Sequence, residues 1–153
     1  MDSWRKLVII FLLLLQFALV LAFALLAYGH LDECRRWNRA SFSENYSTRI
    51  QIEAVGCILN SVLAVVQFLS SCCVVMNLTG RRLGVMSLQL VPFVFIGATG
   101  LAIILWIVTP FAGSPHNDIA RGLGYFLLIA VALLGALVAS IQNVLLRSIN
   151  RKP

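Results

Sequence analysis

Apolar residues gather in four long stretches of the chain. They occupy residues 7–28, 54–76, 88–109 and 123–146, and none of these stretches contains a charged side chain. A helix needs about 20 apolar residues to cross a hydrocarbon layer about 30 Å thick, because it rises about 1.5 Å per residue. Each stretch is long enough, so the pattern predicts four membrane-spanning helices.

The predicted fold is therefore an all-α membrane protein, a four-transmembrane-helix antiparallel bundle that forms a single domain over residues 1–153. Four spans put both termini on one side of the membrane. The connecting segments are then a long first outer loop at 29–53, an inner loop at 77–87 and a second outer loop at 110–122.

A cleavable signal peptide is the alternative for the first stretch. Arg5 and Lys6 precede it, and Ala22-Phe23-Ala24 has the A-x-A form of a cleavage site. The apolar run is nevertheless longer than the roughly 7 to 15 residues of an ordinary signal core. We therefore expect a retained first span.

The composition agrees with a membrane protein. Hydrophobic residues make up 60% of the chain and charged residues 12%, whereas soluble domains have about 45–50% and about 25%. This mixture excludes a soluble enzyme, a nucleic-acid-binding domain and a disordered chain. No nucleic-acid partner is expected.

The net charge of +6 gives the orientation. Basic residues outnumber acidic ones in the head, the inner loop and the tail, which carry net charges of +1, +2 and +3, whereas Arg and Asp or Glu balance in both outer loops. Because Lys and Arg concentrate on the cytoplasmic side, both termini are predicted to be cytoplasmic. The plasma membrane or a membrane of the secretory pathway is the expected location.

Two glycosylation sequons bear on this orientation. Asn45-Tyr46-Ser47 lies in the first outer loop and Asn77-Leu78-Thr79 in the inner loop, so at most one is used. The longer loop is the better acceptor. We predict Asn45 as the glycosylation site.

The predicted spans contain no ionisable residue, which leaves a pump or a proton-coupled transporter without candidate groups. Their polar side chains are neutral, and we expect these to hydrogen-bond between helices. These neutral polar side chains include Gln16, Asn60, Gln67, Thr99, Ser140 and Gln142. They are scattered and do not form the continuous polar stripe that a pore needs.

Small residues follow one face of the fourth span, where they allow a close approach of backbones. Packing within the bundle is the first interpretation, and an interface offered to a second protein is the other. The face consists of Ala132, Gly135, Ala136, Ala139 and Ser140.

The four cysteines have three settings. Cys34 in the first outer loop and Cys57 in the second span either form a disulfide or stay free. Cys72 and Cys73, near the inner end of the second span, are either palmitoylated or simply packed.

Known catalytic and nucleotide-binding motifs are missing from the sequence. His30 and His116 fall in different predicted outer loops, which does not make a metal site. No catalytic residue, metal or cofactor is therefore assigned.

Three segments carry a family resemblance: Arg49-Ile50-Gln51-Ile52-Glu53-Ala54 before the second span, Leu78-Thr79-Gly80-Arg81-Arg82 after it, and Gly122-Leu123-Gly124-Tyr125 at the fourth. In these and in its layout the chain resembles the peripheral myelin protein, epithelial membrane protein and claudin group of tetraspan proteins. The resemblance implies a four-helix bundle. The first outer loop departs from that group, because it lacks the G-L-W-x-x-C signature and a second cysteine.

The leading functional hypothesis is a non-enzymatic tetraspan that acts by lateral association, as an accessory or organising subunit of a membrane-protein or junctional complex. Its expected partners are membrane lipids and another membrane protein or a second copy of itself. Arg35, Arg36 and Trp37 are the loop residues expected to face a partner.

The alternative hypothesis is a small four-span membrane enzyme of lipid or thiol-conjugate metabolism. Such an enzyme needs polar or basic side chains that point into a cavity between helices. Arg49, Arg121 and Tyr125 are the candidates for that role.

Overall fold

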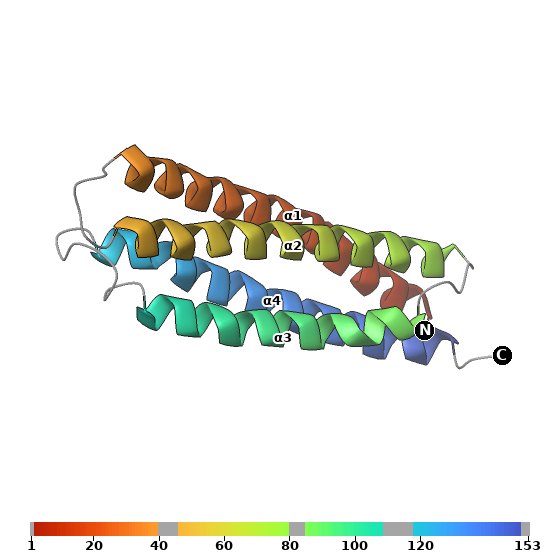
Figure 1. Ribbon diagram of the computed structural model, residues 1–153. Coiled ribbons are helices and arrows are strands. Elements are labelled where there is room, and N and C mark those ends of the chain that lie inside the picture. Colours follow the sequence, from red (N-terminus) through yellow and green to blue (C-terminus); the bar gives the residue numbers. More distant parts are fainter. Residues whose placement is uncertain (1, 40–45, 80–84, 109–117, 151–153) are drawn as a thin grey trace.

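A computed structural model gives four long α-helices lying alongside one another (Figure 1). The structure describes residues 2–39, 46–79, 85–108 and 118–150. The helices are α1 (Asp2–Arg39), α2 (Tyr46–Leu78), α3 (Val85–Val108) and α4 (Asp118–Asn150). Each of the four is long and apolar enough to cross a membrane, which confirms the prediction of an all-helical, multi-pass membrane protein.

The first two helices extend well beyond the predicted spans. α1 continues to Arg39 and α2 already begins at Tyr46, so most of the predicted first outer loop is helical. Neither extension contains proline, and the alternation of buried and exposed side chains continues into both. The helical stretches long enough to span a membrane accordingly reach Arg36 in α1 and begin at Ile50 in α2.

The buried side chains recur at intervals of three and four residues. This spacing keeps them on one face of a helix and is typical of neighbouring helices that cross at a shallow angle. In α4 the buried positions are Tyr125, Leu128, Ala132, Gly135, Ala136, Val138, Ala139, Gln142 and Leu146.

Contacts at the two ends of the bundle relate three of the helices. Ile9 near the start of α1 packs with Val74 and Leu146 near the ends of α2 and α4. Toward the opposite end of α1, His30 contacts Glu53 and Tyr125, which are the eighth residues of α2 and α4, respectively. The start of α1 and the end of α4 thus lie at the same end (Figure 1).

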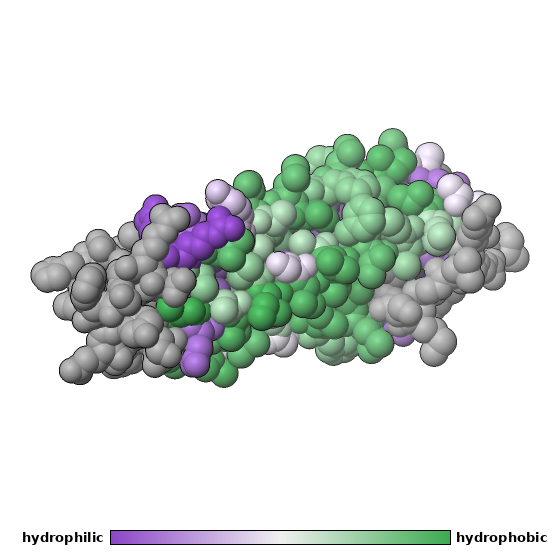
Figure 2. All heavy atoms as spheres, turned by 45° about the horizontal axis from the view of Figure 1, so that its top comes forward, coloured by the Kyte–Doolittle hydropathy of each residue, from purple (hydrophilic) through white to green (hydrophobic). Residues whose placement is uncertain are grey.

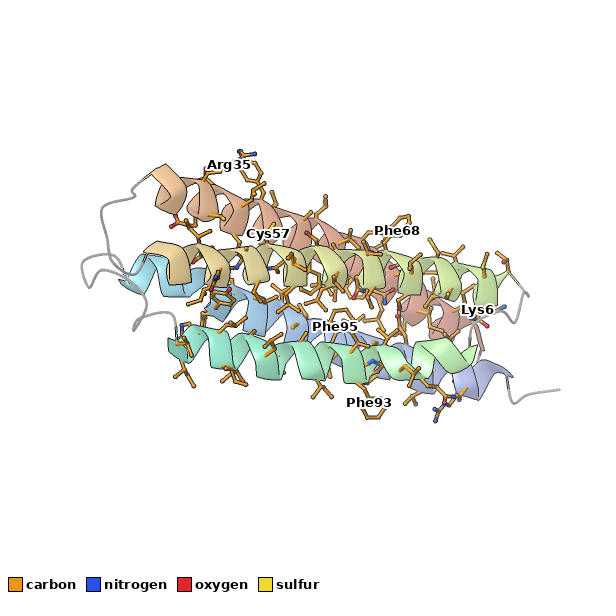
Figure 3. The ribbon with its side chains drawn as sticks, in the orientation of Figure 1. Lys6, Arg35, Cys57, Phe68, Phe93 and Phe95 are labelled. Carbon is orange, nitrogen blue, oxygen red and sulfur yellow. The ribbon has the colours of Figure 1, made fainter. Side chains whose placement is uncertain are left out.

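α3 packs mainly against α4. Phe95 stacks on Phe23 of α1 with ring centroids 5.8 Å apart and also lies against Gly135 of α4. Nearer one end, the Trp106 and Phe126 rings are 6.1 Å apart. Figure 3 shows Phe95 directed into the bundle and Phe93, two residues earlier, directed away from it.

The outer surface of the bundle is apolar and its interior contains amides. Side chains such as Leu25 and Phe93 are each 71% exposed, whereas Gln16, Asn60 and Gln67 are fully buried. Figure 2 shows this apolar surface over the middle of the molecule, with hydrophilic residues toward its ends. Because lipid solvates apolar side chains and does not solvate amides, this distribution suits a protein surrounded by lipid.

Candidate functional site

Three helices meet at a buried group of polar side chains, which we call the His30 cluster: His30, Glu53, Gly56 and Tyr125. α1 supplies the histidine, α2 the carboxylate and the glycine, and α4 the tyrosine. His30 is 3% exposed, Glu53 1% and Tyr125 0%. Ionisable side chains at this depth are costly unless they are paired.

The pairing within the cluster is specific. Nδ1 of His30 lies 2.6 Å from Oε2 of Glu53, a distance at which the carboxylate accepts a hydrogen bond from the imidazole. The Tyr125 hydroxyl donates to the backbone carbonyl of Ile52. Its ring also lies against the His30 ring, with the centroids 4.7 Å apart. The cluster therefore joins α1, α2 and α4.

Gly56 makes this close approach of the three helices possible. A Cβ atom at this position would lie 2.7 Å from both His30 Nδ1 and the Tyr125 hydroxyl oxygen. Any other residue at position 56 would displace one of these two groups. The glycine is thus part of the cluster, although it contributes no side chain.

The His30 cluster corrects the sequence interpretation. His30 and Glu53 were expected in the first outer loop, and the spans were expected to lack ionisable groups, but both residues are buried in helices. The signal was the helical spacing, because His30 continues the buried series of Phe23 and Ala27.

The Nε2 nitrogen of His30 is buried and has no hydrogen-bond partner among the described residues. A histidine held at Nδ1 by a carboxylate can use Nε2 to accept a proton or to bind a metal. Within the described part of the chain, no group of three His, Cys, Asp or Glu residues could hold a metal ion.

A second polar group lies deeper in the bundle, and we call it the amide layer: Gln16, Gln67, Ser71 and Gln142. Nε2 of Gln142 donates to Oε1 of Gln16 at 3.1 Å, a bond from α4 to α1. The Ser71 hydroxyl of α2 is 3.3 Å from the same oxygen. These are contacts between helices of the kind expected from the sequence.

Other polar side chains bond only to their own helix. Ser61, Thr99 and Ser140 each donate to the carbonyl oxygen four residues earlier, at 2.8 Å in all three cases. These bonds satisfy the hydroxyl groups without linking helices.

An apolar layer separates the His30 cluster from the amide layer. Phe23 lies between His30 and Gln16 along α1, and it stacks on Phe95 of α3. Leu63, 1% exposed, has the corresponding place in α2 and belongs to the same apolar cluster. The two polar groups are thus separate sites.

The small-residue face of α4 lies inside the bundle. Ala132, Ala136 and Ala139 are buried, and a Cβ on Gly135 would come within 3.1 Å of the Phe95 ring. This geometry favours packing within the chain, because a second protein cannot reach the face. Ser140, at its end, is exposed.

All four cysteines are free thiols. Cys34 Sγ is 3.8 Å from the carbonyl oxygen of Ile50, and Cys57 lies seven residues further along α2, a rise of about 10 Å. The structure therefore does not bring the two together, since a disulfide needs Cα atoms within about 7 Å. Cys72 and Cys73 are half-buried in α2.

The residues expected to face a partner belong to a helix and not to a loop. Arg35, Arg36 and Trp37 all lie in the last part of α1, and both arginines are exposed. Figure 3 shows Arg35 directed away from the bundle. Arg36 pairs locally, at 3.4 Å from Asp32 and 3.3 Å from Glu33.

Asn45, predicted to be glycosylated, lies outside the described residues, as does His116. Of the three candidate residues of the enzyme hypothesis, Tyr125 is fully buried within the bundle. The other two, Arg49 and Arg121, belong to α2 and α4.

Comparison with known proteins gives no relative: no protein-family model, no curated protein and no solved structure matches the chain.

Proposed function

We propose that the protein is a non-enzymatic membrane protein that acts by lateral association, as an accessory or organising subunit of a membrane-protein or junctional complex. Its partner contributes a membrane-spanning helix that packs against the outer face of α3. The observation that carries this proposal is a pair of exposed glycines on that face.

Gly97 and Gly100 are both exposed, and a Cβ atom on either would meet nothing within 4 Å. They differ in this from Gly56 and Gly135, whose missing side chains let other helices of the same chain approach closely. Glycine within a helix costs about 1 kcal/mol relative to alanine. No contact with the described residues offsets that cost at positions 97 and 100.

Large apolar side chains surround the two glycines, among them Phe93 and Ile104, which are 71% and 59% exposed. Such a notch between large residues lets a second helix approach closely in the membrane, where small residues favour association. α3 is also the least buried of the four helices, at 22% of its span compared with 44% for α4. Within its span, this helix therefore has the largest unburied fraction available to a partner.

The proposed arrangement is an antiparallel bundle with both termini cytoplasmic, in the plasma membrane or a membrane of the secretory pathway. The contacts of Ile9 and His30 at opposite ends of α1 support alternating helix directions. The distribution of basic residues supports the orientation. The sequence resemblance to the peripheral myelin protein and claudin group supports a tetraspan role of this kind.

The test compares wild-type protein with Gly97→Leu/Gly100→Leu, purified from the native membrane in mild detergent after crosslinking in cells. The wild type should be crosslinked to a partner chain or to a second copy, and the double variant should lose that species while staying folded. Ala24→Leu, a matched change at an exposed small residue of α1, should retain it. A wild type without any crosslinked species, or a double variant that keeps it, refutes the proposal.

One observation favours the alternative, a membrane enzyme of lipid or thiol-conjugate metabolism. The His30–Glu53 pair leaves Nε2 of a buried histidine without a partner among the described residues, as a general base requires. Lipid or glutathione that co-purifies with wild type and is lost in His30→Gln would support the enzyme. Their absence from the purified wild type would count against it.

A further inference from the structure

The amide layer contains polar atoms for which the described residues supply no hydrogen-bond partner. Gln67 is fully buried, and neither Oε1 nor Nε2 of its side chain has a hydrogen-bond partner among the described residues. Nε2 of Gln16, also fully buried, has none either. A buried amide without partners is costly, and surrounding lipid cannot supply them.

Exchanging the oxygen and nitrogen of an amide does not remove the problem. For Gln16 it would change which atom lacks a partner, since the other atom contacts both Ser71 and Gln142. For Gln67 it changes nothing, because both atoms are unpartnered. The layer therefore needs a hydrogen-bonding group that the described part of the chain does not supply.

We propose that the amide layer binds buried water, with Gln67 as its principal attachment. Water is the smallest molecule that both donates and accepts, and buried water typically makes about three hydrogen bonds to such groups. Gln67 offers one acceptor and two donor hydrogens, and Gln16 offers further donors. The inference concerns the bundle interior and does not depend on the proposed association through α3.

A metal cation fits the layer less well. Calcium and magnesium prefer several oxygen ligands, including carboxylates, and the four residues of the layer include no carboxylate. The Glu53 carboxyl group lies beyond the apolar layer of Phe23 and Leu63. A neutral ligand matches the neutral side chains.

The local geometry explains why water remains there. The Ser71 hydroxyl donates to the backbone carbonyl oxygen of Gln67 at 2.8 Å, so its single hydrogen is not available to the Gln67 side chain. Gln142 is committed to Gln16 at 3.1 Å. Both residues thus already use a donor hydrogen on a group other than the Gln67 side chain.

The test is solid-state NMR of full-length protein in lipid bilayers, with transfer of magnetisation from water to the side-chain amides of glutamine. The Gln67 amide signal is assigned by its loss in Gln67→Leu, or in Gln67→Met if the first variant does not fold. Gln89→Leu, a change of the same kind at a half-buried residue near the start of α3, is the matched control for assignment and should leave the Gln67 signal unchanged.

We expect transfer from water to the wild-type Gln67 amide several times faster than to the backbone amide of buried Leu63, which is bonded within α2. Equal, slow transfer to both groups in folded protein would show a dry layer and overturn the proposal. A partner chain lost or retained at α3 would not alter either result.

Discussion

The close approach of three helices at Gly56 leads to a sharp prediction about stability. Replacing Gly56 by alanine adds one methyl group, which would lie 2.7 Å from His30 Nδ1 and from the Tyr125 hydroxyl oxygen, and 2.8 Å from His30 Cε1. Neither ring can move freely, because the tyrosine is bonded to the Ile52 carbonyl and the histidine to Glu53. The substitution must therefore separate helices or break one of these bonds.

The magnitude follows from three contributions. Overpacking a core costs about 1–3 kcal/mol, and a buried polar group left without its partner costs about 1–3 kcal/mol. Alanine returns about 1 kcal/mol through its higher helix propensity. We expect Gly56→Ala to lower the free energy of unfolding by about 3 kcal/mol, the middle of the resulting range.

The assay is reversible unfolding in mixed micelles, in which the denaturing detergent is increased and the loss of helix is followed by circular dichroism. Gly29→Ala is the matched control, because a Cβ at Gly29 meets nothing within 4 Å. It should leave stability unchanged or raise it by up to about 1 kcal/mol. If the two variants were equally stable, the packing described for Gly56 would be wrong.

Two further predictions concern other contacts in the bundle. Gly135→Leu should destabilise the folded chain by at least about 1–3 kcal/mol, because even a Cβ comes within 3.1 Å of the Phe95 ring; unchanged unfolding in the same assay would contradict this packing. Glu53→Leu alone should cost about 3–5 kcal/mol, because it removes one partner of a buried pair. Adding His30→Phe should then cost less than it does in the wild type, and simple additivity of the two changes in a double-mutant cycle would refute the coupling.

Much of the fold could be predicted because membrane insertion depends on local composition. The charge-free stretches at 7–28, 54–76, 88–109 and 123–146 each lie largely within one helix. The ends of α1 and α2 could not be predicted in the same way. The predicted second span begins at residue 54 because Glu53 is charged in the sequence pattern. The helix and its buried face nevertheless include Glu53.

The site was harder to predict than the fold. From the sequence alone, Gly56 is one glycine among ten, and nothing distinguishes it from Gly97. The structure distinguishes the two glycines, because Gly56 lies directly against His30 and Tyr125, whereas a Cβ atom at Gly97 would meet nothing within 4 Å. The role of a glycine depends on what would meet its missing side chain, and that is a property of neighbouring helices.

The four apolar helices suited to a membrane follow from the amino-acid sequence, because the exclusion of charge from long stretches is a local property. Which polar residues the interior accepts depends instead on how the helices pack together. His30 and Glu53 are 23 residues apart in the sequence. Burying either side chain is strongly unfavourable unless the folded chain pairs them, as it does by bringing His30 Nδ1 to 2.6 Å from Glu53 Oε2. The free energy of burying a charge depends on that distance, which three-dimensional packing sets.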